Sequence, residues 1–341
     1  MIMASINKRE LLRKVMDNEE VDRVPCGFWH HFVLGWDQFH AVGNKSLQEK
    51  IYQGHVKYYE TVNPDMMKLM NEGFMGYPPI MNNNLETADD LKKIKAIGPN
   101  DPWMNEQVAH VKRLVNAFHD KVYVFYNMFA PLQTLRIRFD FLDGRPNQFV
   151  YLAEHFPDEL RHAGMEIQKD YCTLVTRLFT ETDLDGIYYC VQNVQSKMYN
   201  SMRYAEIIEP TEIEVLRLAN QYRDSNILHI CGYAHHTNNL EFYQKYKAKV
   251  YNWAIHTEGI SLSDGKKFFG GACILGGYDN NPGTLIDTGS KNEVQAYAKK
   301  LIQENGYRGF ILGADCSIPN DIDDTRVKWI SDATYENMKN M

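Results

Sequence analysis

The stretch that decides the fold reads Asn226-Ile227-Leu228-His229-Ile230-Cys231, an apolar run that carries a histidine and ends in a cysteine. Similar apolar runs recur along the chain, and longer segments with helical spacing separate them. We predict strands over residues 24–29, 65–71, 122–127, 186–191, 226–231, 250–255, 272–276 and 309–313. The predicted helices cover residues 46–62, 103–119, 157–182, 202–223, 240–246, 261–269 and 291–305. Eight alternating units predict an α/β fold of the (β/α)8 TIM-barrel type.

The two ends of the chain fit the same plan. Residues 7–18 predict a helix before the first strand, with Ser5 or Asn7 as its cap, so we expect residues 1–20 to form an N-terminal helical extension. No Gly/Ser-rich or Pro-rich linker divides the sequence. We therefore predict one barrel domain over residues 1–341.

The composition excludes several classes of partner. The net charge is −7 and no long run of Lys or Arg is present, so we expect no nucleic-acid binding. No apolar stretch reaches about 18 residues, the length of a membrane span. The first residues lack the apolar core of a signal peptide. Six cysteines in so long a chain suit a reducing cytoplasm rather than a disulfide framework.

Three residues predict a zinc site at one end of the barrel. His229 and Cys231 are two apart in a strand, so both side chains face the same side. Cys316 follows the predicted strand over residues 309–313, and active sites of TIM barrels lie at the carboxyl ends of the strands. Three protein ligands leave a fourth position open, as in catalytic zinc sites. The alternative is that both cysteines are small apolar fillers of the core.

Polar and aromatic residues at the other strand ends predict a substrate pocket. We expect His31 and Glu72 to act as catalytic groups, either as general acid or base or, for Glu72, as an orienting carboxylate. Glu258 could fill the open zinc position or begin a helix. We expect substrate contacts from Trp29, His30, Asn127, Tyr189 and Gln192. For each of these residues, a place in the core or on a solvated loop is the competing interpretation.

The sequence resembles the uroporphyrinogen decarboxylase superfamily over nearly its whole length. The resemblance begins at Asp22-Arg23-Val24-Pro25 and is strongest at His229-Ile230-Cys231-Gly232, Leu275-Gly276-Gly277-Tyr278-Asp279 and Gly309-Phe310-Ile311-Leu312-Gly313. The superfamily contains decarboxylases, which hold a porphyrinogen's carboxylates with arginines after the first strand. It also contains methyltransferases with a His-x-Cys…Cys zinc site, which exchange methyl groups with a corrinoid.

The resemblance is to the methyltransferase branch. The segment Cys26-Gly27-Phe28-Trp29-His30-His31-Phe32 contains no arginine, although a polyanionic substrate needs fixed cations. His229, Cys231 and Cys316 match the zinc motif of coenzyme M methyltransferases and of the methyltransferases of O-demethylase systems. The resemblance thus implies methyl transfer between a corrinoid (cobalamin) and either a thiol or a small methylated substrate. The aromatic residues after the first strand favour a methoxylated aromatic as donor.

The resemblance also implies a corrinoid protein as partner. Corrinoid-carrying domains bind the cofactor through an Asp-x-His-x-x-Gly loop, and the nearest match here has Ala254 in the place of the aspartate. We therefore expect a separate protein to carry the corrinoid. The sequence leaves the direction of transfer and a homo-oligomeric state open. The alternative functions are decarboxylation of a porphyrinogen-like acid and a non-catalytic zinc-stabilised binding protein.

Overall fold

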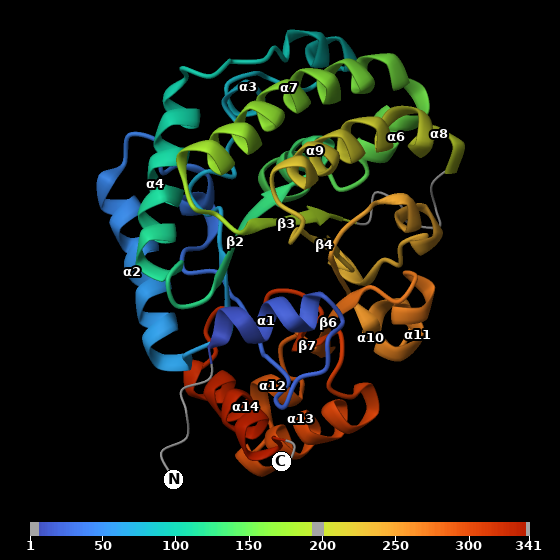
Figure 1. Cartoon of the computed structure of the whole chain (residues 1–341). Coiled ribbons are helices and arrows are strands. Elements are labelled where there is room, and N and C mark those ends of the chain that lie inside the picture. The colour runs from blue at the N-terminus through green and yellow to red at the C-terminus, as the bar shows by residue number, and fades with distance from the viewer. Residues whose placement is uncertain (1–6, 193–200, 339–341) are drawn as a thin grey trace.

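The structure, a computed structural model, describes residues 7–192 and 201–338. Its centre is a curled sheet of seven parallel strands in which every strand pairs with its neighbours in the sequence (Figure 1). Helices surround this sheet on its outer side, so the described residues form an α/β fold of the TIM-barrel type. The strands are β1 (Met66–Leu69), β2 (Tyr123–Phe129), β3 (Gly186–Val191), β4 (Ile227–Ile230), β5 (Val250–Trp253), β6 (Cys273–Tyr278) and β7 (Phe310–Ala314).

Helices separate most strands as the sequence predicts, and several short ones were not expected. Between β4 and β5 the predicted helix over residues 240–246 is a 3-10 helix, Leu240–Lys245. The larger helices are α1 (Lys8–Met16), α2 (Lys45–Val62), α4 (Pro102–Phe118), α7 (Pro157–Glu181), α9 (Glu209–Tyr222), α13 (Lys291–Asn305) and α14 (Asp324–Glu336). The shorter ones are α3 (Pro78–Met81), α5 (Pro131–Ile137), α6 (Gln148–His155), α8 (Ser201–Ile207), α10 (Ile255–Glu258), α11 (Leu262–Phe268) and α12 (Leu285–Thr288). The predicted helix over 202–223 is two helices because Pro210, which lacks an N–H group, lies in the first turn of α9.

The predicted first strand over residues 24–29 is not a strand, and this part of the prediction is wrong. The segment makes one parallel bridge, Cys26 with Leu312 of β7, and the N–H of Asp65 donates to the carbonyl of Cys26 (3.1 Å). Pro25 has no N–H to donate, so a regular ladder cannot form there. The segment nevertheless lies between β7 and β1, in the eighth position of the barrel.

Helix α1 closes the end of the barrel opposite the predicted active site. Its apolar residues Leu11, Leu12, Val15 and Met16 are buried in one cluster with inward-facing strand residues such as Phe125 and Ile227. In Figure 1 the helix lies across the front of the barrel. The side chain of Asn7 caps it by accepting from the N–H of Glu10. This helix therefore packs directly against the inward-facing residues of the sheet.

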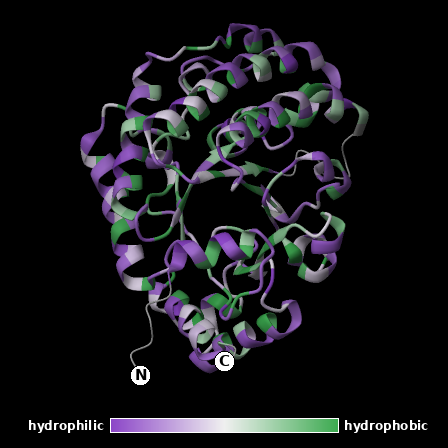
Figure 2. Cartoon of the chain, viewed as in Figure 1, coloured by the Kyte–Doolittle hydropathy of each residue, from purple (hydrophilic) through white to green (hydrophobic). Residues whose placement is uncertain are grey.

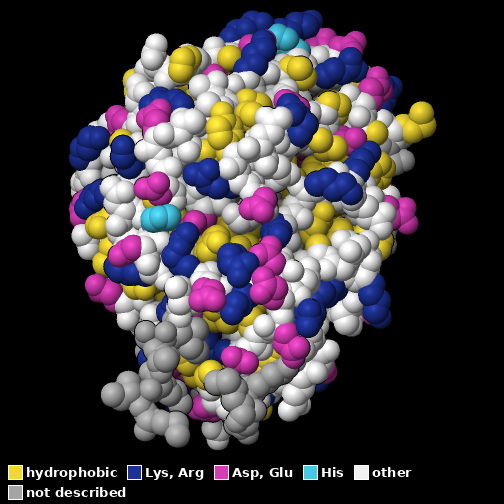
Figure 3. Space-filling view, viewed as in Figure 1, with side chains coloured by type: hydrophobic (Ala, Val, Ile, Leu, Met, Phe, Trp, Pro, Cys, Tyr) yellow, Lys and Arg dark blue, Asp and Glu magenta, His cyan; other side chains and the backbone are white. Residues whose placement is uncertain are grey.

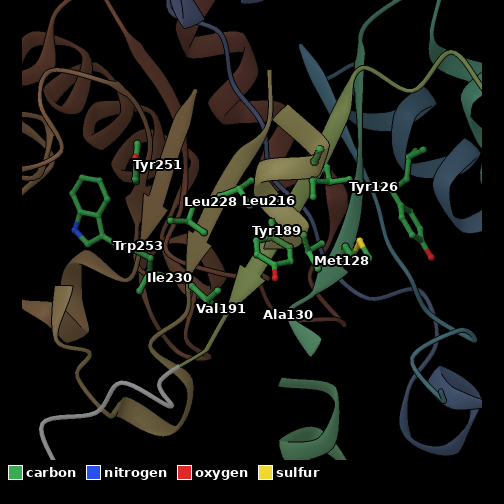
Figure 4. Packing of buried hydrophobic residues seen from close by; sticks show 14 of the residues in the cluster. Tyr126, Met128, Ala130, Tyr189, Val191, Leu216, Leu228, Ile230, Tyr251 and Trp253 are labelled. Carbon is green, nitrogen blue, oxygen red and sulfur yellow. The ribbon is translucent and has the colours of Figure 1, made fainter. Parts of the chain in front are cut away.

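A second, larger apolar cluster fills the layer between the strands and the outer helices. Figure 4 shows strand residues of this layer, including Tyr126, Tyr189, Leu228 and Trp253, together with Leu216 of α9. In Figure 2 the helices carry hydrophilic residues on their outer sides and hydrophobic ones toward the sheet. Both faces of the strands are thus buried, as expected of a parallel sheet.

The surface has no dominant charge on the face that Figure 3 shows, where Lys and Arg alternate with Asp and Glu. Among the helices of the described residues, none is long and apolar enough to cross a membrane.

A buried carboxyl group ties α8, α9 and the turn after Lys245 together. Glu212 of α9 is fully buried and accepts hydrogen bonds from the hydroxyl groups of Tyr204 and Tyr246 (2.7 Å for Tyr246). Burial raises the pKa of Glu212 to about 7, although the two tyrosine hydrogen bonds oppose this shift. The pKa of the group in the unfolded chain is close to its ordinary value of 4.5.

We expect this group to make stability depend on pH. Between pH 4.5 and about 7 the folded chain holds a proton that the unfolded chain has lost, so this group's contribution falls as pH rises. As pH rises between these two values, the wild type should lose on the order of 3 kcal/mol of unfolding free energy, and Glu212→Gln should not show this loss. Urea unfolding at a series of pH values measures the difference. Glu214→Gln, on the exposed side of the same helix, should show the same loss as the wild type.

Candidate metal centre

Three potential metal ligands converge at the carboxyl ends of β4 and β7. His229 lies in β4, Cys231 is the first residue after β4, and Cys316 lies just after β7. Their ligand atoms lie within 4.8 Å of one another. The Sγ atoms of the two cysteines are 3.6 Å apart, and Nε2 of His229 is 3.4 Å from Sγ of Cys316. These two thiols and one imidazole are a donor set that zinc prefers.

Asn252 of β5 fixes which nitrogen of His229 is available to a metal. The side-chain amide of Asn252 donates to the carbonyl groups of Leu275 (2.9 Å) and Ala314 (3.1 Å), which identifies its oxygen as the acceptor on the other side. That oxygen accepts from Tyr188 (2.8 Å) and from Nδ1 of His229. His229 therefore carries its proton on Nδ1 and directs the lone pair of Nε2 toward Cys316.

The two thiols, Cys231 and Cys316, are also suited to bind a metal cation. A hydrogen bond from the Cys231 thiol lowers the pKa of Cys316 well below its ordinary value, against the effect of burial. Sγ of Cys316 and Nε2 of His229 face each other at 3.4 Å. A hydrogen atom or a metal ion can join these two atoms, and the third donor, Cys231, favours the metal.

The three residues lie in the wall of a cavity of about 70 Å³. Side chains from four different strands and from the loop after β7 contribute to it. The described residues that line it are His31, Lys68, Met70, Asn127, Phe129, Cys190, Gln192, His229, Cys231, Cys316 and Ser317. A metal ion held by His229, Cys231 and Cys316 would therefore be accessible to a small molecule in this cavity.

The two residues predicted to be catalytic lie together. His31 lines the cavity, and its Nδ1 is 2.9 Å from a carboxylate oxygen of Glu72. Glu72 is fully buried, does not line the cavity, and also accepts from the backbone N–H groups of Phe32 (3.0 Å) and Val33 (3.1 Å). Glu72 thus holds the loop that carries His31 and orients the imidazole ring, as the prediction of an orienting carboxylate allowed.

Of the five predicted substrate contacts, Asn127 and Gln192 line the cavity. The amide of Asn127 donates to Asn71 (2.5 Å), and its oxygen accepts from the thiol of Cys190 (3.1 Å). Gln192 is paired with Gln133, which both donates to and accepts from it (3.0 and 2.8 Å). Both side chains are therefore held in place beside the metal ligands.

Trp29 and His30 are placed differently from the prediction. Trp29 is buried among the inward-facing residues, with its ring 4.9 Å from the ring of Tyr188, and does not line the cavity. His30 turns toward α14, where its Nε2 lies 2.9 Å from a carboxylate oxygen of Asp324. His31 therefore faces the cavity and His30 does not, although the two residues are adjacent.

The prediction for Tyr189 is wrong. Its hydroxyl group donates to the carbonyl of Glu212 in α9 (3.0 Å), and its ring lies in the outer apolar layer (Figure 4). The neighbours Tyr188 and Cys190 face the barrel interior instead. The run over residues 186–191 is apolar throughout, so the sequence does not show which alternate residues point inward.

Sequence reasoning missed three residues of the centre: Lys68, Cys190 and Asn252. Lys68 and Asn252 are polar residues within otherwise apolar strands, β1 and β5, and that exception was the available signal. Cys190 has no ligand-like spacing to another cysteine or histidine in the sequence, yet it lines the cavity. Burial raises the pKa of Cys190 to about 12, so it remains a neutral thiol. Glu258, by contrast, bonds Asn238 (2.8 Å) and does not line the cavity.

We expect Asn252→Leu to weaken zinc binding. Without the acceptor oxygen, His229 can place its proton on Nε2, the nitrogen that faces Cys316. Loss of such an orienting partner reduces metal affinity by about 10–100-fold. Competition with a chelating dye measures the zinc affinity. Asn226→Leu, at the start of the neighbouring strand and away from the cavity, should leave that affinity within about threefold of the wild type once folded protein is compared.

A comparison with protein-family models identifies the family of this chain. The family model described as uroporphyrinogen decarboxylase (URO-D) matches residues 66–336, which is more than half of the sequence. The chain belongs to the uroporphyrinogen decarboxylase family. This confirms the resemblance seen in the sequence, and the match includes all three candidate metal ligands of this family member. No curated protein matches the chain in sequence.

Solved structures show the same fold. A methyltransferase from Methanosarcina mazei superimposes with a TM-score of 0.69 at 16% identity, covering 97% of this chain and 98% of its own. A B12-independent methionine synthase from Shewanella sp. W3-18-1, in complex with selenomethionine, gives 0.55 at 10% identity and covers 92% and 96%. At these identities the comparisons show the fold alone.

Proposed function

We propose that this protein is a zinc-dependent methyltransferase that moves a methyl group between a small substrate and a corrinoid carried by a partner protein. The observation that carries the proposal is the convergence of His229, Cys231 and Cys316 on the wall of one cavity. Family membership and the fold shared with a methyltransferase agree with it.

His229, Cys231 and Cys316 would hold the zinc. When bound there, zinc supplies Lewis acidity toward the heteroatom of a methyl donor or toward a thiol. The protein's own residues prepare this position: Asn252 directs the imidazole, and the N–H of Cys231 donates to the carbonyl of Val191 (2.9 Å), which fixes the start of the loop. A corrinoid on the partner protein would supply the cobalt that gives or takes the methyl group.

His31 is suited to handle a proton in this reaction. Its Nδ1 faces the carboxylate of Glu72, so Nε2 is free to take or give a proton at the cavity. A thiol acceptor has to lose a proton, and a methoxy donor has to gain one on the departing oxygen. His31 would serve either direction, and Glu72 would act as a positioning residue.

The size of the cavity favours a small substrate. A buried apolar cavity of about 150 Å³ accommodates benzene, and the cavity here measures about 70 Å³. It has room for a methyl group, its heteroatom and a few further atoms. An aromatic donor could place its methoxy group in this cavity, but its ring would have to lie outside it.

The family's decarboxylase activity finds less support. A porphyrinogen carries several carboxylates and exceeds the size of this cavity. Among the described residues that line the cavity, Lys68 is the one lysine or arginine. The segment over residues 26–32 contains no arginine either.

A methyl-transfer screen tests the proposal. Zinc-loaded protein is mixed with cob(I)alamin or a purified corrinoid protein and with methanol, methylamines, methoxyaromatics or methylated thiols. For the opposite direction, methylcobalamin is mixed with the protein and a thiol. We expect the cobalt spectrum to change with one donor class and only when zinc is present. Failure with every donor and every thiol, or release of carbon dioxide from uroporphyrinogen at enzymatic rates, would contradict the assignment.

A further inference from the structure

A buried lysine with no hydrogen-bond partner lies at the metal centre. Lys68 of β1 points into the barrel and lines the same cavity as His229, Cys231 and Cys316. The residue is 6% exposed. Its Nζ lies 3.9 Å from the ring centroid of Tyr188 and 4.5 Å from that of Trp29. Two aromatic faces therefore support the cation from one side, while the other side faces the cavity.

The aromatic faces do not satisfy the ammonium group. An ammonium group has three N–H donors, and ring faces stabilise its charge without offering lone pairs. Within residues 7–192 and 201–338, Nζ of Lys68 contacts the two rings and makes no hydrogen bond or ion pair. Buried charged groups are otherwise paired, so the free donors indicate that an acceptor enters the cavity from outside the chain.

The charge of the residues around the cavity also favours an anionic ligand. Among the described lining residues, none is aspartate or glutamate. The nearby carboxylate of Glu72 is occupied by the N–H groups of Phe32 and Val33 and by His31. A zinc ion held by two thiolates and one neutral imidazole adds no net charge. The ammonium group of Lys68 then leaves the cavity positive.

We propose that Lys68 binds the anionic group of the substrate, which is a small organic carboxylate or related oxyanion. The carboxylate would accept hydrogen bonds from Nζ, and the methyl-bearing heteroatom or the thiol would lie toward Cys231 and Cys316. This inference rests on the proposed function for the reaction, but the binding itself does not need a corrinoid. Lys68 is thus the residue that selects an anion over a neutral molecule of the same shape.

Matched pairs of probes test the selection. Methoxyacetate is compared with methoxyacetamide, and 3-mercaptopropionate with 3-mercaptopropionamide, by calorimetric titration of the full zinc-loaded chain without corrinoid. We expect the wild type to bind each carboxylate at least about tenfold more tightly than its amide, the range of a hydrogen bond to a charged group. Lys68→Met should weaken carboxylate binding by about 10–100-fold and leave the zinc content unchanged.

Two further variants make the result decisive. Lys112→Met removes an exposed lysine of α4 and should bind both carboxylates as the wild type does. Lys68→Arg keeps the charge and should retain the preference for carboxylates. If Lys68→Met does not fold, the preference of the wild type and of Lys68→Arg still tests the proposal.

Three results would overturn the assignment of Lys68. They are equal binding of carboxylate and amide by the wild type, unchanged carboxylate binding by Lys68→Met, and chloride binding as tight as that of the carboxylates, which would indicate an adventitious ion only. The proposed function fails separately. Carboxylate selection without methyl transfer to or from any corrinoid would contradict the methyltransferase and leave the anion site in place.

Discussion

Replacing Cys316 by alanine should abolish zinc binding and methyl transfer together. Sγ of Cys316 is the atom that lies close to both other ligands, 3.6 Å from Cys231 and 3.4 Å from His229. The ligands come from β4 and from the loop after β7, so no other residue of that loop brings a thiolate to the same point. Loss of a direct ligand should cost more than the about 100-fold that loss of an orienting partner can cost.

The measurement is the zinc content of purified Cys316→Ala and Cys231→Ala after metal loading and dialysis. We expect about one zinc per chain in the wild type and almost none in either variant. Cys190→Ala is the sharpest control, because Cys190 is a third thiol of the same cavity but lies outside the ligand group. Cys273→Ala tests a buried thiol deeper in the barrel.

The controls also test the ligand set itself. Both control variants should keep their zinc. Full zinc content in Cys231→Ala and Cys316→Ala would rule out the centre, and loss of zinc in Cys190→Ala would show that the ligand set is wrong.

Replacing Asp65 by alanine should destabilise the protein by about 3–5 kcal/mol. Arg23 and Asp65 form a buried pair in which both side chains are 1% exposed, joined by two hydrogen bonds of 2.6 and 2.8 Å. The same carboxylate accepts from the N–H of Cys26 (2.9 Å), where the chain closes the barrel. In Asp65→Ala the guanidinium would remain buried with only Thr334 (3.0 Å) and the ring of Tyr335 as partners.

Chemical denaturation measures the free energy of unfolding. Asp332→Ala, which removes an exposed ion pair with Lys328 on α14, should cost less than about 1 kcal/mol. Amide hydrogen exchange gives a local measurement. The N–H groups of Gly27 and Leu312, which bond across the closure, should exchange faster in Asp65→Ala. Equal costs for both variants would show that this pair does not hold the barrel closed.

The closing segment shows why the sequence misled about one strand. Residues 24–29 have the apolar character of a strand, but Pro25 cannot donate and Gly27 passes very close to β1. A β-carbon on Gly27 would lie 2.5 Å from Cγ of Met66. The position of the segment in the barrel was predictable from its order in the chain. Its contact with Asp65, which accepts from Arg23 and from the N–H of Cys26, joins residues far apart in sequence.

The sequence alone determined the elements whose signals are local. The capped helix over Lys291–Asn305 and the strand over Gly186–Val191 match their predicted ranges, because helix caps and apolar runs act over a few residues. The like-facing pair of His229 and Cys231 follows from the two-residue period of a strand. Cys316 could be joined to that pair from the sequence because the carboxyl ends of barrel strands meet at one edge.

Only the tertiary structure decided how these elements face one another. Strands that are buried on both sides do not alternate apolar and polar residues, so the sequence does not show which residues point inward. The packing of the helices decides this. It places Tyr189 in the outer layer and brings Lys68 and Cys190 to the cavity. The orientation of His229 depends on Asn252, which lies in another strand, and the role of Glu72 depends on the loop that it holds. Contacts between segments distant in sequence determine these features, so local sequence patterns cannot predict them.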